Sequence, residues 1–542
     1  MAALATGYRS ALYGSVALRL RVLALIAICL AEQLVVVDNT LVNVALPAMA
    51  VELQARMSGL QWIVDAYTLA FAGLLLALGH LGDRYGRRRV MIIGLAGVAV
   101  MSAVGALSTS LPEVIVARAG MGVFAAAVFP ATLALIIGLF PGGRGRAAAI
   151  AVWSAMAGIA VATGPLAGGF LLRYFSWHAV FWINVPIALI AVTAVLLMVP
   201  ESRAEHTGRL DVAGVVLSLI AVITLVWTII EAPKQGWLSS RSVAGYAIAA
   251  ILLVVYVVWE LRVESPVLNV RLLGIRRFSV PALAITVSYF CAFGFTFLIT
   301  QYFQGVREYS ALEFGIRSLP FAAAVGVGAA VGTMVARRIG TTATVIAGLV
   351  LLAAGMYAAG RIAVDSSYLG LILTTMLLMG VGFGAVQGPA TESIMGSVPL
   401  AQAGAGSAVN DTTREVGGAL GVAVLGSILT SAYTARVGAR IDAVPGTLMN
   451  SAQKSIARES PISVLEMAKA PVGPFLAKPK ADLIDAMKAA AVAGSQTASH
   501  IAVGALLGCA ALVAVLLPWR PERASPGRSD RQSAQQAIQE KA

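Results

Sequence analysis

Charged residues are scarce in this chain. Of its 542 residues, 12% are Asp, Glu, Lys or Arg, whereas 59% are hydrophobic and the mean hydropathy is +0.85. A soluble domain usually contains about 25% charged residues. Hydrophobic runs of about 20 residues, the length that crosses a bilayer, recur along the chain. The composition therefore excludes a soluble globular protein and predicts an all-α integral membrane protein with many spans.

Cysteine and histidine are also scarce. The three cysteines lie in three different apolar runs, and the four histidines show no metal-ligand spacing. A P-loop for nucleotide phosphates is absent from the sequence. We therefore expect no disulfide framework, metal site, cofactor, enzymatic activity or direct use of ATP. The net charge of +13 comes mostly from arginines beside the hydrophobic runs, which indicates membrane orientation and not nucleic-acid binding.

The hydrophobic runs predict about fourteen membrane helices, whose ends are accurate to about four residues. We place them at 22–46, 60–80, 90–109, 112–139, 147–172, 180–199, 212–232, 243–261, 279–303, 315–337, 341–361, 367–389, 405–432 and 498–518. An even number of spans puts both termini on the same side of the membrane.

Arginines in the short loops indicate which side that is. They follow the even-numbered spans, as at Arg84, Arg144, Arg203, Arg276 and Arg337. Because loops rich in Lys and Arg stay in the cytoplasm, we expect cytoplasmic termini. The basic loop 433–497 falls outside, but loops of this length largely escape the rule. The Ala-, Gly- and Arg-rich composition is typical of a GC-rich bacterial genome, and we expect a multi-pass protein of a bacterial inner (cell) membrane.

The chain also contains an internal repeat. The stretch MGVFAAAVFPAT starts at Met121, and the similar MGVGFGAVQGPAT starts at Met379. Such duplication is typical of transporters built from two matched halves around a central site. We expect a six-helix bundle in 1–200, an inserted two-helix hairpin in 201–278, a second six-helix bundle in 279–518 with the extracytoplasmic loop 433–497, and a disordered tail in 519–542.

Asp38 lies in the middle of the first predicted span. A charged side chain there costs about 2.5–3.5 kcal/mol, which a chain tolerates when the group has a partner, faces a cavity or binds a proton. Arg118, in the fourth span, is the best candidate partner, and its repeat-related position holds Met376. The pair is a candidate for proton coupling, and the alternative is a structural ion pair between two helices.

Glu32, Asn39 and Asn43 form a polar stripe on one face of the same predicted helix. Asp38 is turned away from it by about 100°. We expect the stripe to line a cavity and Asp38 to face a neighbouring helix. Alternatively, Glu32 lies near the membrane surface and reaches towards water.

Several motifs together resemble those of the major facilitator superfamily. The stretch GHLGDRYGRRR, 79–89, looks like its signature loop, and DNTLVNVALP, 38–47, resembles the first-helix motif of its fourteen-helix drug:proton antiporter family. WIVDAYTLAFAG, GPLAGG, FWINVP and REVGGALGVAV, starting at 62, 164, 181 and 414, are similar to further motifs of this family. Two departures are Met121, where the family usually has Gln, and His178, where it often has Arg.

The resemblance implies a major facilitator fold and specific roles for polar residues. It implies that Asp38 and Arg118 take part in proton coupling, that Asp65 supports cationic substrates, and that Asp411 and Glu415 contact cations or protons. Alternatively, Asp65 is a helix-cap or interface residue that faces water. The alternative for Asp411 and Glu415 is an exposed cluster at the cytoplasmic start of their helix. Candidate residues of the substrate cavity are Glu32, Asn39, Asn43, Trp62, Tyr67, Gln301, Gln387 and Glu392.

A second group of residues has the spacing of gating elements. Gly164 and Gly168, like Gly328 and Gly332, are four residues apart and allow close helix contact across the bundle interface, and Pro165 bends its helix. The alternative for both glycine pairs is generic helix packing. The signature loop contributes a predicted cytoplasmic latch of ion pairs. Its candidates are Gly79, Asp83, Arg84, Gly86 and Arg87.

Taken with the resemblance, these features predict a proton-coupled antiporter that exports hydrophobic, in particular cationic, small molecules by alternating access. Its expected partners are the substrate, protons and the lipid bilayer, and we expect a monomer. One alternative is an exporter of an endogenous lipid, siderophore or secondary metabolite. Another is a non-transporting scaffold that uses the loop 433–497 and the tail.

Overall fold

The computed structural model describes residues 2–140, 143–203, 210–264, 266, 268, 270–398, 403–445, 449–460 and 474–519. These residues form helices and connecting turns, with no strand among them. Thirteen helices of the described chain are long and apolar enough to cross a membrane. The 32-residue α5 lies between them in sequence, so the helix order follows the fourteen predicted spans. The tail from residue 520 lies outside the described residues.

The first half of the chain forms a bundle of seven helices. They are α1 (Ala2–Glu52), α2 (Met57–Tyr85), α3 (Arg87–Leu107), α4 (Leu111–Leu139), α5 (Gly143–Tyr174) and a last span broken into α6 (His178–Trp182) and α7 (Asn184–Met198). Their main contacts join α2 to α4, α3 to α4 and α7, and α1 to α5 and α7. We call α1–α7 the N half.

The second bundle repeats this packing. It contains α10 (Arg276–Thr300) with its π-helical extension η2 (Gln301–Val306), α11 (Ala311–Ile339), α12 (Thr341–Ala359), η3 (Tyr368–Ile372), α13 (Leu373–Gly396), α14 (Ala403–Asp442) and α17 (Pro474–Leu516). Its contacts join α11 to α13, α12 to α13 and α17, and α10 to α14 and α17. These pairs correspond one by one to those of the N half, as the internal repeat predicts. We call α10–α17 the C half.

A matched glycine allows the same close approach in both halves. A Cβ on Gly122 in α4 would collide with the Tyr67 carbonyl oxygen of α2. A Cβ on Gly380 in α13 would lie 2.6 Å from the Phe321 carbonyl oxygen of α11. Both are the glycine of the repeated Met-Gly pair, so the repeated sequence corresponds to a repeated helix contact.

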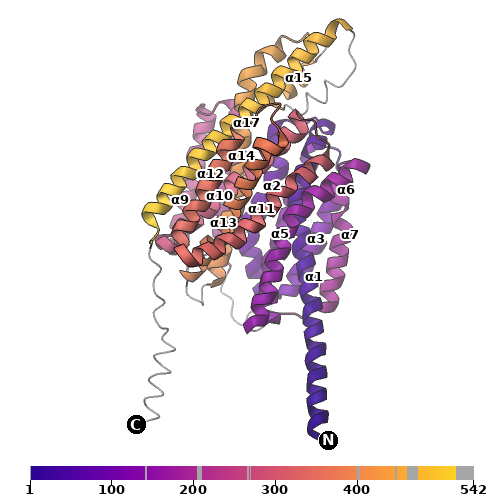
Figure 1. Ribbon diagram of the computed structural model, residues 1–542, viewed down its shortest axis with the longest axis vertical. Coiled ribbons are helices and arrows are strands. Elements are labelled where there is room, and N and C mark those ends of the chain that lie inside the picture. The colour runs from indigo at the N-terminus through magenta and orange to yellow at the C-terminus, as the bar shows by residue number, and fades with distance from the viewer. Residues whose placement is uncertain are drawn as a thin grey trace.

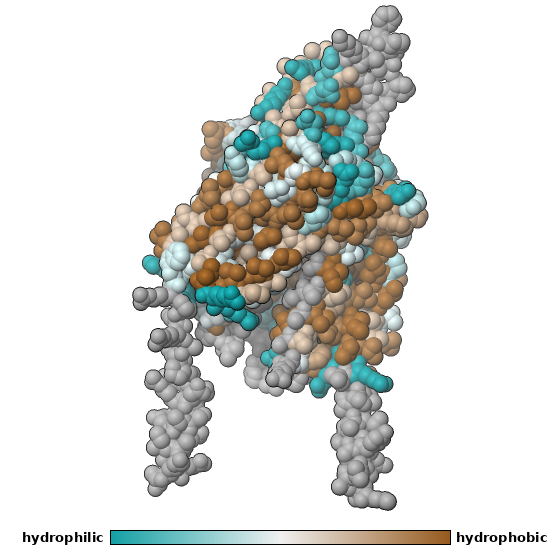
Figure 2. All heavy atoms as spheres, in the orientation of Figure 1, coloured by the Kyte–Doolittle hydropathy of each residue, from teal (hydrophilic) through white to brown (hydrophobic). Residues whose placement is uncertain are grey.

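The inserted hairpin consists of α8 (Val212–Gln235) and α9 (Ser240–Arg262), followed by the short η1 (Val270–Gly274). Helix α8 packs against α2 of the N half and α14 of the C half, whereas α9 contacts mainly α8. The face of α9 away from α8 exposes large apolar side chains such as Ile251 and Val254. Figure 2 shows apolar residues around the middle of the molecule, with polar ones gathered towards its ends.

The two ends of the molecule differ. Helix α1 begins and α17 ends at the lower end in Figure 1, while α15 (Ser451–Glu459) lies at the upper end, which we call the α15 end. Helices α14 and α17 continue well past the ends predicted at 432 and 498, so the described part of 433–497 is mostly helical. The reason lies in an apolar stripe, since Tyr433, Val437 and Ile441 are all fully buried beyond the predicted span.

Candidate functional site

Asp38 lies in the centre of the N half, where three helices meet. Its Oδ2 is 2.5 Å from Nη1 of Arg118 in α4, and its Oδ1 accepts a hydrogen bond of 2.6 Å from Nδ2 of Asn184 in α7. Asp38 is 1% exposed and Arg118 is fully buried. The carboxylate therefore faces neighbouring helices and a guanidinium, as its helical position predicts, and both of its oxygens have partners.

Arg118 extends the cluster towards α2. Its Nε donates to the Ile63 carbonyl oxygen at 3.1 Å, and its Cζ lies 4.2 Å from the centre of the Tyr67 ring. The Tyr67 hydroxyl donates to the Val35 carbonyl oxygen of α1 at 3.3 Å. Helix α2, which carries Tyr67, packs against α14 of the C half. The cluster thus runs from the core of the N half to its border with the C half.

A second group of polar side chains is buried without protein hydrogen-bond partners among the described residues. Both carboxylate oxygens of Glu32 and Asp65, both amide atoms of Gln301 and Gln387, Oδ1 of Asn39 and Oε2 of Glu415 belong to it. An unpaired buried polar group costs about 1–3 kcal/mol, so native proteins rarely keep several without a function. These residues come from both halves and all belong to the predicted site.

The C half contributes a pair of partly buried charges. Arg414 Nη1 lies 3.6 Å from Asp411 Oδ1, and Arg414 Nη2 donates to Thr391 Oγ1 at 3.2 Å. The guanidinium also lies 5.9 Å from the centre of the Tyr289 ring. Asp411 and Arg414 are only about a quarter exposed, so the structure does not place them in a solvent-exposed cluster.

The other predicted cavity residues are placed less uniformly. Asn43 donates through Nδ2 to the Asn39 carbonyl oxygen of its own helix at 2.9 Å. Trp62 is half-buried and packs with residues of α8 and α14, including Val226 and Ala423. Glu392, near the end of α13, is exposed. The sequence could assign these residues to helices but could not tell which neighbour each one contacts.

Asp65 lies on the face of α2 that meets the C half. Gln61, one turn earlier, donates to the Val422 and Ala423 carbonyl oxygens of α14, and Leu69, one turn later, packs against α14 and α8. Residues four apart share a helix face. Asp65 is fully buried between these two contacts. Its unpaired carboxyl is therefore directed to the boundary between the halves.

Several contacts join the two halves towards the α15 end. Gln61 Nε2 reaches the Val422 and Ala423 carbonyl oxygens at 3.0 and 2.8 Å and Ser427 Oγ at 3.3 Å. Gln304 Nε2 donates to the Val44 carbonyl oxygen of α1 at 3.1 Å. Neither glutamine is among the predicted site residues, although each is a polar residue in an apolar run.

Close glycine contacts join α5 to α11 in the same region. A Cβ on Gly169 would lie 2.6 Å from the Ala311 carbonyl oxygen, and one on Gly315 would collide with the Pro165 carbonyl oxygen. Gly164 and Gly168 instead pack against α1, and Gly328 and Gly332 against α13, each within its own half. The expectation that these two pairs meet across the interface was wrong, because spacing reveals a small-residue face but not its partner helix.

Comparison with known protein families shows to which family this arrangement of two matched bundles belongs. The model of the Major Facilitator Superfamily matches residues 28–422. The chain belongs to this superfamily.

Relatives in the superfamily are similar over most of their length. The multidrug efflux pump LfrA of Mycolicibacterium smegmatis is 34% identical over 494 residues, which cover 91% of this chain and 95% of that protein. The tetracenomycin C resistance and export protein of Streptomyces glaucescens is also 34% identical, over 75% of this chain and 76% of its own. Multidrug resistance protein Stp of Mycobacterium tuberculosis is 33% identical over 79% of both chains.

Solved structures share the fold at lower sequence identity. A bacterial homologue of the human lysosomal transporter Spinster, in an inward-facing and occupied conformation, aligns with a TM-score of 0.61 at 17% identity. The alignment covers 92% of this chain and 98% of that one. The major facilitator fold predicted from the sequence is thereby confirmed.

The loop between α2 and α3 of this major facilitator protein docks within the N half. Asp83 pairs with Arg87 at 2.7 Å, and the Arg87 backbone N–H donates to the Ser202 carbonyl oxygen at 2.8 Å. Gly86 has a φ of +116°, which only glycine adopts readily, and a Cβ there would touch the Glu201 carboxylate. Arg84 is exposed, so of the two predicted arginines it is Arg87 that pairs with Asp83, and a role of this pair as a latch stays a prediction.

Two contacts near the site, those of Asn184 and Gly79, were not predicted from the sequence. Asn184 holds the second oxygen of Asp38, and its position in the FWINVP motif was the available signal. Gly79 lies against Pro130 of α4, with a Cβ distance of 3.3 Å, and so supports helix packing next to the loop.

Proposed function

We propose that this protein is a proton-coupled antiporter that exports hydrophobic, in particular cationic, small molecules by alternating access. The observation that carries the proposal is the Asp38–Arg118–Asn184 cluster buried inside a membrane bundle. Buried ionisable groups in membrane spans are expensive and usually mark proton or ion pathways. The names of several relatives, including the efflux pumps, support an export function.

The proposed coupling step is protonation of Asp38. A proton on the carboxyl removes its negative charge and weakens its pair with Arg118. The guanidinium can then shift against the Tyr67 ring, which it faces, and Tyr67 lies on α2, a helix that packs against α14 of the C half. One proton that crosses 100 mV supplies about 2.3 kcal/mol, enough for roughly a fifty-fold gradient of a neutral substrate.

Three unpaired acids support a cationic substrate. Glu32, Asp65 and Glu415 come from α1, α2 and α14 and have carboxylate oxygens without protein partners among the described residues. An organic cation would neutralise them. Aromatic rings add a second attraction, since the Tyr289 ring lies 5.0 Å from that of Phe383 in the C half, and ring faces attract cations.

The membrane orientation follows from the arginine-rich loops, which we assign to the cytoplasm of a bacterial cell. The α15 end is then extracytoplasmic, and both termini are cytoplasmic. The cross-half contacts of Gln61, Gln304, Gly169 and Gly315 would close the outer side. For alternating access we propose that 1–200 and 279–518 move as units, with 201–278 as a hairpin between them, and that the protein works as a monomer.

The test uses purified protein in proteoliposomes with an imposed proton gradient and ethidium as the exported dye. We expect Asp38→Asn to insert normally and to abolish gradient-driven efflux, while Asp442→Asn, which changes an exposed acid near the α15 end, keeps it. Addition of the dye to wild-type protein in weak buffer should release protons. Wild-type efflux by Asp38→Asn would refute the coupling role.

Two rival functions give different results in the same system. An exporter of an endogenous lipid or secondary metabolite should bind a neutral lipid better than a dicationic dye. A scaffold should show no gradient-driven transport of either compound. A scaffold also leaves the unpaired acids of the cavity without a role.

A further inference from the structure

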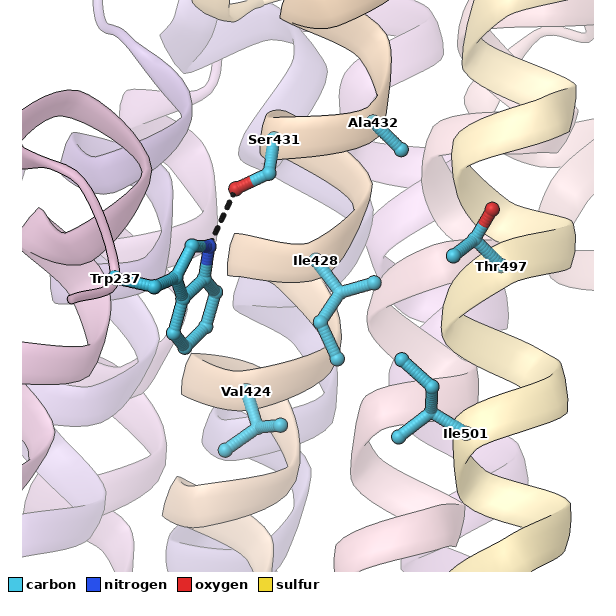
Figure 3. A pocket seen from close by; sticks show the side chains of 7 residues that line it. All are labelled: Trp237, Val424, Ile428, Ser431, Ala432, Thr497 and Ile501. Carbon is cyan, nitrogen blue, oxygen red and sulfur yellow. Dashed lines mark hydrogen bonds between the residues drawn. The ribbon is translucent and has the colours of Figure 1, made fainter.

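A groove in the wall of the protein is separate from the polar site. It has a volume of about 530 Å³ and lies between the loop that follows α8, helix α14 and helix α17. Figure 3 shows side chains from all three elements around it, with Val424 and Ile428 from α14, Ile501 from α17 and Trp237 from the loop. A volume of this size suits a ligand of several hundred cubic ångströms, such as one hydrocarbon chain.

The lining is mostly apolar, and its few polar side chains have hydrogen-bond partners in the protein. Trp237 Nε1 donates to Ser431 Oγ at 2.9 Å, and Thr497 Oγ1 donates to the Ala493 carbonyl oxygen of its own helix at 2.8 Å. Each of these three polar side chains therefore already has one hydrogen-bond partner within the protein. The groove therefore favours a hydrocarbon occupant over a hydrated molecule.

With the membrane orientation proposed above, the groove faces the bilayer and lies near its extracytoplasmic surface. Helices α14 and α17 contribute residues from their membrane-spanning segments, and Ile501 is 48% exposed. Trp237 belongs to the loop at the α15 end of the hairpin, and tryptophan is enriched where lipid headgroups meet the hydrocarbon. The surrounding medium at this depth consists of lipid chains, so they are the immediate source of an occupant.

A positively charged side chain, that of Arg436, lies beyond the end of the groove that is nearest the proposed headgroup layer. Arg436 is one helical turn beyond Ala432, which lines the groove, and its Nη1 donates back to the Ala432 carbonyl oxygen at 2.9 Å. Arg436 is exposed, and it forms no ion pair with a carboxylate in the described part of the chain. Arg440, one turn further, is exposed as well. Guanidinium groups bind phosphate well.

We propose that this groove is a phospholipid-binding site, which takes one acyl chain along Val424, Ile428 and Ile501 and places the lipid phosphate against Arg436. The chain fills the space between α14, α17 and the hairpin loop, and the phosphate meets the cation at the depth of Trp237. Such a lipid would form part of the contact between the inserted hairpin and the C half.

The test reconstitutes the full chain in nanodiscs that contain an anionic phospholipid with a photoreactive group in its acyl chain. After irradiation, mass spectrometry maps the labelled residues. We expect labelling to concentrate on α14 around Ile428 and on α17 around Ile501. Ala432→Trp, which fills the groove, should reduce labelling there to the level of other lipid-facing helices, whereas Val254→Trp on the exposed face of α9 should not.

Arg436→Gln tests the headgroup contact without any change to the groove. It is an exposed substitution, so the fold should be kept. We expect it to lower labelling by the anionic lipid about fivefold, the factor that one surface arginine contributes. Even labelling of all lipid-facing helices would overturn the proposal. So would unchanged labelling of Ala432→Trp, or displacement of the lipid by ethidium, which would make the groove a substrate site.

Discussion

The two halves share a helix arrangement but differ at the centre. In the N half, Arg118 of α4 pairs with Asp38 in a buried polar cluster. In the C half, the repeat-related position of α13 holds Met376, which is 1% exposed in an apolar core. The same scaffold therefore supports either an ion pair or a methionine at this position, so the pair is not needed to form the bundle.

This difference indicates that the ion pair is not needed for the stability of the bundle. An apolar core of similar volume is often as stable as a buried ion pair, because ion pairs must be desolvated on folding. The C half shows that this protein can build the apolar version. Retention of the charged version in the N half is therefore best explained by function, which the following experiments test.

The largest effect should come from Arg118→Met, which gives the N half the residue of the C half. It leaves Asp38 buried without its cation, and we expect a loss of about 3–5 kcal/mol in unfolding free energy and no gradient-driven efflux. The double variant Asp38→Asn/Arg118→Met should regain much of the stability but no efflux. Thermal unfolding and dye efflux measure the two effects.

The matched control is Met376→Leu in the C half. A volume-conserving change of this kind should cost less than about 1.5 kcal/mol and should keep efflux. If the double variant exported dye at the wild-type rate, the ion pair would be structural and the two halves equivalent.

The repeated glycine contacts should give the next effect. Gly122→Ala and Gly380→Ala each place a methyl group against a carbonyl oxygen of the neighbouring helix, and overpacking of this kind costs about 1–3 kcal/mol. We expect Gly122→Ala to lower the melting temperature more, since its carbonyl is closer. Gly504→Ala, which has nothing within 4 Å of its Cβ, should not lower it. A smaller loss for Gly122→Ala would contradict the geometry.

Removal of the Gln61 side-chain hydrogen bonds should favour the conformation in which the two halves are apart at the α15 end. Gln61→Leu removes bonds that join the halves near the α15 end, about 1 kcal/mol for each typical bond. We expect a membrane-impermeant reagent, added from that side, to label cysteines placed next to Asp65 more strongly. Gln496→Leu, whose bond to the Ile362 carbonyl oxygen lies within the C half, should leave labelling unchanged. Equal labelling of both variants would show that Gln61 does not hold the halves together.

The smallest effect concerns the contact between α15 and the N half. Arg56 reaches Glu459 Oε1 at 3.4 Å and Ser455 Oγ at 2.7 Å. Burial raises the pKa of Glu459 above its ordinary value, although Arg56 and Lys234 oppose this shift. The docked state therefore favours the protonated carboxyl. The contribution of Glu459 to the stability of the docked state is therefore largest below the ordinary carboxyl pKa. It is lost as pH rises through the raised pKa of Glu459.

Spin labels on α15 and on the loop between α1 and α2 can measure this docking. We expect their separation to increase as pH rises through the raised pKa of Glu459. Glu459→Gln, which cannot ionise, should remove the pH dependence. A separation that decreases with rising pH would mean that the ion pair outweighs burial.

The sequence predicted the helical spans well because apolar length follows directly from bilayer thickness. It also placed Asp38 beside Arg118, since an acid and an arginine in apolar runs have few other partners. It was wrong for Gly164 and Gly328, because a small residue fits many neighbours. The extension of α14 to Asp442 was missed, since its buried apolar residues are spaced along one face and do not form a continuous apolar run.

The sequence by itself determined a duplicated all-helical membrane protein of the major facilitator superfamily, because hydrophobic length, charge placement and repeated motifs are local properties of the chain. Only the tertiary structure decided that Asn184 completes the Asp38 cluster, that Gln61 bridges the halves, and that α14, α17 and the hairpin loop enclose a groove. These contacts depend on how helices rotate and pack against partners distant in sequence, which the order of residues does not state.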